Sequence, residues 1–233
     1  MAKHGKKYRS VRSKVEEKVY ELEEALTFLK ANPVAKFDET AELAARLTVD
    51  PPQSDQNVRG TVSLPHGVGK VVRVVAFAKG DAAEEARKAG ADVVGIEDLI
   101  EKVKGGWLEF DVAVATPEAM QEVRKLGKVL GPRGLMPNPK TGTVSEDLAA
   151  AVTQCKAGRV EFRMDRNANV QVPFGKLSFD VKKLAENAQA VIAAILAERP
   201  AAIKGAFVKK WSVSSTMGVG LRINVKDQQE RGA

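Results

Sequence analysis

The chain has 233 residues, 44% of them apolar and 29% charged, a composition typical of folded proteins with one large or two modest domains. It contains no run near the ~20 apolar residues of a membrane span, no apolar signal segment after the basic N-terminus, and a single cysteine, Cys155. These features exclude a disulfide framework and a thiolate zinc cage. We expect a cytoplasmic protein with no metal, cofactor or membrane partner.

The net charge of +7 is distributed unevenly along the chain. Residues 68–158 carry 13 Lys and Arg against 13 Asp and Glu, whereas residues 1–67 and 159–233 together carry 24 against 17. The positive charge therefore belongs to the two flanks. A basic surface of this kind favours a polyanionic partner.

Residues 68–158 alternate strand and helix signals. VVRVVAFA (71–78) is nearly all apolar, as expected of a strand buried on both faces, and a helix with Asp81 as its N-cap and a terminal glycine follows it. The next predicted elements are strand 91–95, helix 96–106, strand 111–116, helix 117–127 with proline in its first turn, and helix 145–158 capped by Ser145. Repeated strand–helix units predict a small, largely parallel sheet with helices on its faces.

The flanks have a different pattern. A helix is predicted at about 22–31, and every second residue from 41 to 49 is apolar, which favours a strand although the residues are good helix formers. RVEFRMD (159–165) also alternates, 180–200 has the apolar stripe of a helix, and 206–225 has the pattern of two strands. These signals predict a discontinuous α+β domain of residues 1–67 plus 159–233, with an α/β domain of residues 68–158 inserted into it.

The two crossing points between these predicted domains contain glycine. LPHGVGK (64–70) leads into the insertion and KAGRV (156–160) leads out of it. Two short glycine-containing strands side by side would form a hinge, because few contacts need to cross such a boundary. The predicted hinge residues are Pro65, Gly67, Gly69 and Gly158.

The most distinctive segment is LGPRGLMPNPKTGTV (130–144), whose three glycines and three prolines exclude a regular helix or a central strand. Between Glu122 and Glu146 there is no acidic residue but there are five cations. Prolines lower the entropy lost on ordering, and glycines let another backbone approach closely. A preorganised cationic loop suits a partner that carries phosphates.

Catalytic and nucleotide-binding motifs are not supported. His4 lies in the basic tail, His66 in the predicted hinge, and Cys155 on a helix where a small buried side chain is expected. KTG (140–142) occurs without any SxxK motif, and GVG (67–69) precedes a strand and lacks the third glycine of a dinucleotide fingerprint. We therefore expect no catalytic residues.

Several short segments favour nucleic acid. Lys36 and Phe37 form a cation–aromatic pair at the start of a predicted strand, where they could contact a phosphate and stack on a base or sugar. Phe37 also shares the odd-numbered register of the apolar residues that follow it, so the sequence leaves open whether it is core or exposed. Arg159, Arg163 and Arg166 alternate with apolar residues as a cationic stripe would, although a solvated strand face explains each of them singly. SSTMGVG (214–220) mixes hydroxyls with glycines, as a ribose contact or an ordinary hairpin loop would.

Taken together, these segments resemble one family, that of the first protein of the large ribosomal subunit (universal L-one), which forms the mobile lateral stalk. The resemblance covers essentially the whole chain and rests on five blocks in the family's order. They are AKFDETAEL, SDQNVRGTVSLPHGVGK, LGPRGLMPNPKTGTV, KAGRVEFR and SSTMGVGLRIN. It implies a split α+β domain with an inserted Rossmann-like α/β domain.

The resemblance also implies partners and site residues. Family members bind a folded junction in large-subunit ribosomal RNA, help release deacylated tRNA from the exit site and, in bacteria, repress translation by binding their own operon mRNA; we expect a monomer off the ribosome. The pattern and the resemblance together give the RNA-binding candidates Lys36, Phe37, Thr40, Glu42, Arg163, Arg166, Lys176, Ser214, Thr216, Met217 and Gly218. The implied secondary RNA contact consists of Gly131, Arg133, Gly134 and Lys140.

Two other functions remain open on the residues alone. The first is a module that binds a small phosphorylated ligand in a cleft between hinged domains. The second is an enzyme with a phosphate-bearing substrate, which is disfavoured because no base, nucleophile or metal constellation is present.

Overall fold

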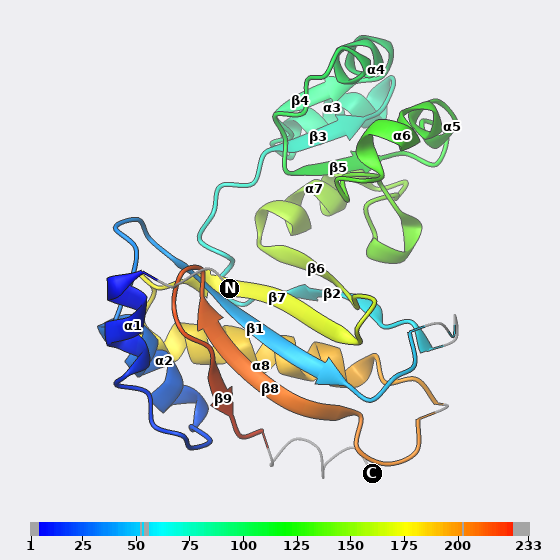
Figure 1. Ribbon diagram of the computed structural model, residues 1–233. Helices are drawn as coiled ribbons and strands as arrows, with labels where there is room; N and C mark the ends of the chain where they lie inside the picture. The colour runs from blue at the N-terminus through cyan, green and yellow to red at the C-terminus, as the bar shows by residue number, and fades with distance from the viewer. Residues whose placement is uncertain (1–4, 52, 54–55, 202, 226–233) are drawn as a thin grey trace. The chain divides into compact units, whose positions relative to one another are not determined.

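The computed structural model describes residues 5–51, 53, 56–201 and 203–225 (Figure 1). Its backbone contacts divide the chain into two compact units. The split unit consists of residues 1–69 and 160–233, and the inserted unit consists of residues 70–159. The chain is a mixed α/β protein, and each unit has its own sheet and its own apolar core.

The main sheet of the split unit has four antiparallel strands in the order β7-β1-β8-β9. They are β7 (Asn169–Lys176), β1 (Thr40–Leu47), β8 (Val208–Ser215) and β9 (Leu221–Ile223). Alternate residues of β1, from Ala41 to Leu47, are at most 2% exposed. The period-two pattern therefore outweighs the helix propensity of TAELAARL, and the strand prediction is confirmed.

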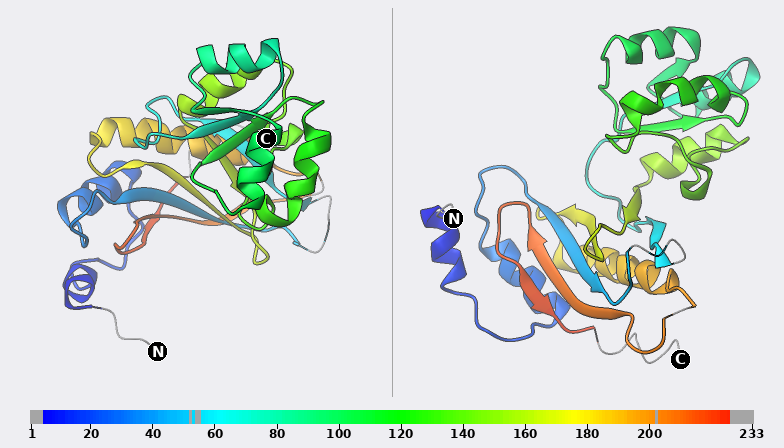
Figure 2. Two further views of the ribbon diagram at one scale, coloured as in Figure 1. Left: turned by 90° about the horizontal axis from the view of Figure 1, so that it is seen from above. Right: turned by 45° about the vertical axis from the view of Figure 1, so that its right-hand side comes forward.

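Two helices cover one face of this sheet, as the views in Figures 1 and 2 show. They are α2 (Leu22–Ala31) and α8 (Val181–Ala197), both predicted from their apolar stripes. Leu184, Val191 and Ile195 of α8 are fully buried against the sheet. Burying side chains of this size stabilises the fold by roughly 1.5–3 kcal/mol each.

The split unit also contains elements that the sequence pattern did not predict. They are α1 (Lys6–Arg12), β2 (Arg59–Ser63) and strand β7. Strand β2 pairs with β6 (Arg159–Arg163) in a separate two-stranded sheet. The pair is supported by an ion pair of 2.6 Å between Arg59 and Glu161, so part of the predicted strand face is neutralised.

The inserted unit is built on a parallel sheet in the order β4-β3-β5. The strands are β3 (Val74–Phe77), β4 (Val93–Gly95) and β5 (Val112–Ala115), and the longer helices are α3 (Asp81–Lys88), α4 (Glu97–Lys104) and α7 (Leu148–Lys156). Alternate residues of β3 belong to two different apolar clusters, one containing Val75 and Phe77 and the other Val74 and Ala76. Burial on both faces explains the continuous apolar run of this strand.

Several local predictions for the inserted unit are wrong in detail. Val71 is 88% exposed and lies before β3, so the buried strand is shorter than 71–78. The N-cap of α3 is Gly80 rather than Asp81. Helix α7 is capped by Asp147, whose carboxylate accepts a hydrogen bond of 2.9 Å from the Ala150 N–H, and not by Ser145.

The predicted helix 117–127 is three short pieces instead of one. They are α5 (Met120–Val123), the 3₁₀ turn η2 (Arg124–Leu126) and α6 (Gly127–Leu130). Pro117 lies in a turn before the first of them. The segment 64–70 is also not a strand, because residues 65–66 form a turn, residues 69–70 form a bend, and Gly67 and Gly69 have φ of 65° and 77°. Within the described residues, no helix is both long and apolar enough to span a bilayer.

Candidate nucleic-acid interface

Residues from three distant parts of the chain meet at one end of the four-stranded sheet of the split unit. In the strand register Thr40 lies opposite Lys176, and Ala41 lies opposite Ser215. The segment before β1, the end of β7 and the β8–β9 hairpin loop therefore lie side by side. Most of the predicted RNA-binding residues belong to these three segments, and we call this place the sheet-end cluster.

Hydrogen bonds tie the members of the sheet-end cluster to one another. The Lys176 ammonium donates to the Thr40 hydroxyl at 2.8 Å and to the Asp38 carbonyl oxygen at 3.2 Å. The Thr40 N–H donates to the Thr216 hydroxyl at 3.0 Å, and the Thr216 N–H donates to the Thr40 carbonyl at the same distance. These contacts hold the ammonium and both hydroxyls in place. Each group still has a hydrogen-bond donor or acceptor position that a ligand can use.

The centre of the cluster is Glu39, which is 1% exposed and was not among the predicted site residues. One carboxylate oxygen accepts the N–H groups of Val34 at 2.9 Å and of Ala35 at 2.6 Å. The other accepts the Ser215 hydroxyl at 2.5 Å and the Met217 N–H at 3.2 Å. A single buried carboxylate therefore fastens the loop before β1 to the loop after β8.

The same contacts set the ionisation of Glu39. Burial alone would raise its pKa, but the hydrogen bonds from Ser215, Ala35, Met217 and Val34 outweigh burial, and the pKa lies below its ordinary value of 4.5. The carboxylate is therefore charged at neutral pH. Its charge is satisfied by four donors rather than by a cation.

Two large apolar side chains stand exposed on the loops that Glu39 fastens. Phe37 is 58% exposed and Met217 is 55% exposed, and they are two of the four large hydrophobic residues that are exposed in the described part of the chain. The sequence left the place of Phe37 open; the structure shows that the chain bends here before β1 begins at Thr40, so the strand register does not extend to it. Exposed apolar side chains on loops that are held together by hydrogen bonds are suited to stacking on bases or sugars.

The other predicted residues of the split unit lie in two places. Lys36 is exposed beside Phe37, and Glu42 lies opposite Ser214 on the outer face of the sheet, half-exposed. Arg163 and Arg166 lie elsewhere, around a cavity of about 370 Å³ near the start of β7, whereas Lys176 ends that strand. Arg166 lies in a turn after β6, and Arg159 donates a hydrogen bond of 2.7 Å to Gln154, so the three arginines do not form one continuous stripe.

Gly218 belongs to the cluster for a steric reason. A Cβ atom at this position would lie 2.2 Å from the Ser215 Oγ atom. Any side chain at residue 218 would displace the hydroxyl that donates to Glu39. The glycine therefore protects the contact between the two loops.

The loop 130–144 of the inserted unit uses most of its polar groups internally. The Thr143 hydroxyl accepts the Asn138 N–H at 2.8 Å, and the hydroxyls of Thr141 and Thr143 donate to the Asn138 carbonyl at 3.0 and 3.1 Å. Thr141 is 2% exposed, and Val144 forms a bridge with Ala115 of β5. This loop is a packed extension of the inserted unit.

The tip of this loop, residues 131–134, is a continuous exposed stretch, and Pro139 is also exposed. The tip contains the predicted contacts Gly131, Arg133 and Gly134, and the last has φ of 71°. Lys140 lies in the 3₁₀ turn η3 (Pro139–Thr141), and its side chain is outside the described part of the structure. One of the five cations, Lys125, is paired with Glu122 at 2.6 Å.

The predicted hinge segment contacts a buried amide that sequence reasoning missed. The side chain of Asn187 on α8 is fully buried, accepts the His66 N–H at 3.1 Å, and donates to the carbonyls of Gly67 at 3.0 Å and Phe174 at 2.8 Å. His66 itself is bonded to Glu186. An asparagine within the apolar stripe of a helix was the available signal, because a buried amide needs partners.

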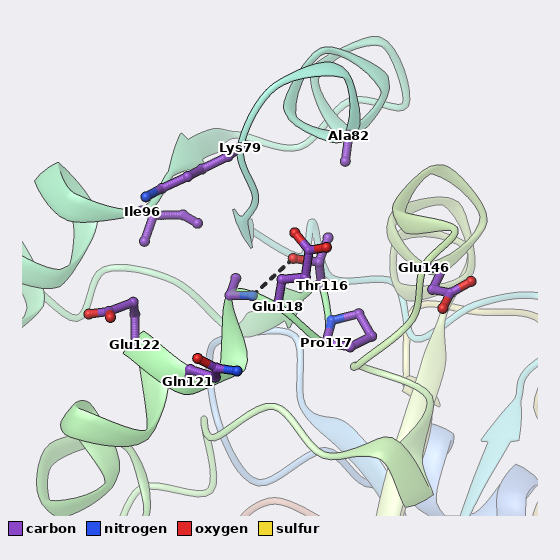
Figure 3. Close-up of a pocket in the computed structure, with 10 residues that line it drawn as sticks. Lys79, Ala82, Ile96, Thr116, Pro117, Glu118, Gln121, Glu122 and Glu146 are labelled. Atoms are coloured by element: carbon purple, nitrogen blue, oxygen red, sulfur yellow. Dashed lines mark hydrogen bonds between the residues drawn. The ribbon is translucent and has the colours of Figure 1, made fainter.

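The inserted unit has a cavity of about 510 Å³ at the carboxyl ends of β3 and β5. Figure 3 shows three carboxylates around it, from Glu118, Glu122 and Glu146. Lys79 is the one cation of its lining, and it is paired with Glu97 at 3.1 Å. Acidic walls repel phosphate, so this cavity does not support a phosphorylated small ligand.

No arrangement for metal or nucleophilic chemistry is found in the described residues. No group of three His, Cys, Asp or Glu side chains there could hold a metal ion. Cys155 is 5% exposed, and burial raises the pKa of its thiol, as expected of a packed and unreactive side chain.

Comparison with known proteins agrees with these features. The sequence profile of the ribosomal protein L1p/L10e family matches residues 29–219, which include the sheet-end cluster and the whole inserted unit. The chain is 53% identical over 227 residues to the large ribosomal subunit protein uL1 of Fervidobacterium nodosum, and the alignment covers 97% of each chain. The chain therefore belongs to the ribosomal protein L1 family.

Proposed function

We propose that the protein is a structural constituent of the large ribosomal subunit and binds large-subunit ribosomal RNA through the sheet-end cluster of its split unit. The observation that carries this proposal is the exposure of Phe37 and Met217 on loops joined by the buried Glu39. Their rigid presentation beside Lys176 and two threonine hydroxyls gives RNA a stacking surface, a cation and groups that can bond a ribose 2′-OH. Membership of the ribosomal protein L1 family supports the same proposal.

In this proposal, charged contacts and hydrogen bonds have different roles. Lysine and arginine contacts to phosphates supply affinity that falls as salt rises. Specificity comes from the shape of the RNA and from hydrogen bonds with Thr40, Ser214, Thr216 and the backbone near Gly218. No bond is made or broken, so the protein acts by binding alone and not as an enzyme.

The proposal gives the protein two further roles, release of exit-site tRNA and repression of its own operon mRNA. Domain 1–67 plus 159–233 holds the lateral stalk on the ribosomal RNA, while domain 68–158 and its loop tip approach exit-site tRNA and assist its release. Off the ribosome, a cytoplasmic monomer represses translation because its own operon mRNA presents a similar structure to the same cluster. Ribosomal RNA and that mRNA must then compete for the protein.

A binding titration tests the proposal. Affinity for a structured fragment of large-subunit ribosomal RNA is measured at several salt concentrations and compared with a panel of nucleotides, and the operon mRNA is then added as competitor. We expect tight, salt-dependent RNA binding, displacement by the mRNA and no nucleotide response. A salt-independent response to a nucleotide, without RNA affinity, would refute the proposal.

Two variants localise the surface. We expect Phe37→Ala and Thr216→Val each to weaken RNA binding at least tenfold. Thr216→Val also removes the two neutral hydrogen bonds of the hydroxyl, which accepts the Thr40 N–H at 3.0 Å and donates to the Thr40 carbonyl at 3.3 Å, each worth about 1 kcal/mol of stability. The control is Val71→Ala, which truncates an exposed apolar side chain of the inserted unit and should leave RNA affinity unchanged. If a variant unfolds while its folded fraction binds normally, the residue is structural.

A further inference from the structure

Among the described residues, the two helices that pack on the four-stranded sheet lie on one face of it, and the opposite, outer face carries no helix. Helices α2 and α8 pack on the inner face, where the alternate residues of β1 and β8 are buried. On the outer face, β1 and β8 present three register pairs in succession. They are Glu42 with Ser214, Ala44 with Ser212, and Arg46 with Lys210.

The side chains change in character along this face. Ala44, Ser212 and Ser214 are short, so the middle of the sheet lets another chain approach the backbone closely. Arg46 and Lys210 are exposed and lie directly opposite each other at the end far from Thr40. Like charges in such a position repel and destabilise a strand pair.

No acidic residue in the described part of the chain relieves this repulsion. Neither Arg46 nor Lys210 has an ion pair there, although the surrounding split unit contains several, such as Arg59 with Glu161. The pair therefore costs the fold stability and gains nothing from a neighbour. An anion bound between the two side chains would attract both, so the net electrostatic interaction at this position would become favourable.

The face joins this cation pair to the sheet-end cluster. Six residues separate Thr40 from Arg46 along β1, which corresponds to about 20 Å of strand. One RNA segment can reach both ends, because phosphates of one strand recur roughly every 3.4 Å along a nucleic-acid helix. Arg166 also lies toward this far end, since it precedes β7, whose first residue, Asn169, is opposite Arg46.

We propose that Arg46 and Lys210 form a second phosphate site for the same RNA, whose backbone runs from the sheet-end cluster along β1 and β8 over Ala44 and Ser212. This inference rests on the proposed RNA-binding function and extends it to the whole outer face. Glu42 is the one carboxylate on this path along β1 and β8, where it accepts a hydrogen bond from a 2′-OH or a base amino group.

The test compares two double variants that lose equal charge. Arg46→Gln with Lys210→Gln removes the pair, whereas Lys182→Gln with Lys183→Gln removes two exposed cations of α8, on the covered side of the sheet. Binding of the ribosomal RNA fragment is titrated between 50 and 200 mM salt. We expect the magnitude of the slope of log K against log salt to fall by about 1.4–1.8 in the first variant only.

Two further measurements separate a binding role from a structural one. The exchange Arg46→Lys with Lys210→Arg keeps both charges and should keep the slope. Removal of the pair should leave the midpoint of thermal unfolding unchanged or raise it, because a repulsion is lost.

Each outcome has a definite meaning. If the wild type binds RNA and the two charge-removing variants have equal slopes, the second phosphate site is refuted and the proposed function stands. If the wild type shows no salt-dependent RNA affinity, both proposals fail.

Discussion

The loop 130–144 of the inserted unit and the sheet-end cluster of the split unit use their polar groups in opposite ways. The loop bonds Asn138, Thr141 and Thr143 to one another, and its longest exposed stretch is the tip, residues 131–134. The cluster buries one carboxylate, Glu39, and exposes an aromatic ring, a thioether and a cation around it. A segment with an unusual sequence can therefore be shaped by its own packing, whereas the two loops of the proposed RNA surface are joined by a buried residue.

The two units also differ in net charge, and the difference favours the split unit as the RNA-binding one. The split unit carries 23 Lys and Arg against 17 Asp and Glu, whereas the inserted unit, residues 70–159, carries 14 against 13. Electrostatic attraction of RNA should therefore be strongest at the split unit. The comparison predicts that damage to the cluster lowers RNA affinity far more than damage to the loop.

The largest effect is expected from Glu39→Gln. The amide keeps the shape but replaces one acceptor oxygen by a donor that faces N–H or O–H groups, and hydrogen bonds to a charged group contribute about 1.5–3 kcal/mol each. We expect a loss of about 2–4 kcal/mol in the free energy of unfolding, measured with urea, and at least a tenfold loss of RNA affinity in the folded protein. Glu17→Gln, at an exposed site, is the control. Normal RNA binding by folded Glu39→Gln protein would show that the loops do not depend on the carboxylate.

A smaller effect is expected from Gly218→Ala. The added Cβ atom would lie 2.2 Å from Ser215 Oγ, so the hydroxyl must rotate away from Glu39. We expect a loss of about 1–2 kcal/mol in stability and a several-fold loss of RNA affinity. Gly220→Ala is a matched control in the same hairpin loop, because no atom lies within 4 Å of its Cβ position. Equal behaviour of the two variants would contradict the steric argument.

The ionisation of Glu39 gives a prediction that depends on pH. Its pKa in the folded protein lies below the ordinary 4.5, so the carboxylate contributes stability above pH 4.5 that is lost as pH falls through the folded pKa. Stability of the wild type should therefore decrease more steeply below pH 4.5 than that of Glu39→Gln, by at most about 1.4 kcal/mol per pH unit. Other carboxylates with a lowered pKa, such as Asp92 and Asp165, are present in both proteins and cancel. Parallel pH profiles would show that the contacts of Glu39 do not favour its charged form.

Sequence patterns predicted the elements that rest on periodic burial. The helices α2 and α8 and the strand β1 were found because their apolar residues recur at fixed spacing. Strand β7 was missed because Pro173 and Gly175 interrupt its pattern, and its conformation is fixed by pairing with β1, about 130 positions away in the chain.

The candidate site was predicted in its outer residues and missed in its centre. Phe37, Thr216 and Lys176 were identified from residue type and resemblance, whereas nothing in AKFDETAEL distinguishes Glu39 from its exposed neighbours. Its hydrogen-bond partner Ser215 is 176 residues away. Burial produced by such distant contacts has no local signal, so the fold was needed to find it.

The smallest effect is expected at the loop tip. Arg133→Ala with Lys140→Ala removes two cations of the inserted unit. We expect RNA affinity to fall only two- to threefold, because much of the loop is bonded to itself and the unit has a net charge of only +1. Lys102→Ala with Lys104→Ala removes the same charge from α4 and should change affinity still less. These two double variants and the single variant Thr216→Val are titrated with the same RNA fragment at one salt concentration. A loss from the loop variant equal to that from Thr216→Val would move the principal RNA surface to the inserted unit, since two cations of its loop would then matter as much as a central hydroxyl of the sheet-end cluster.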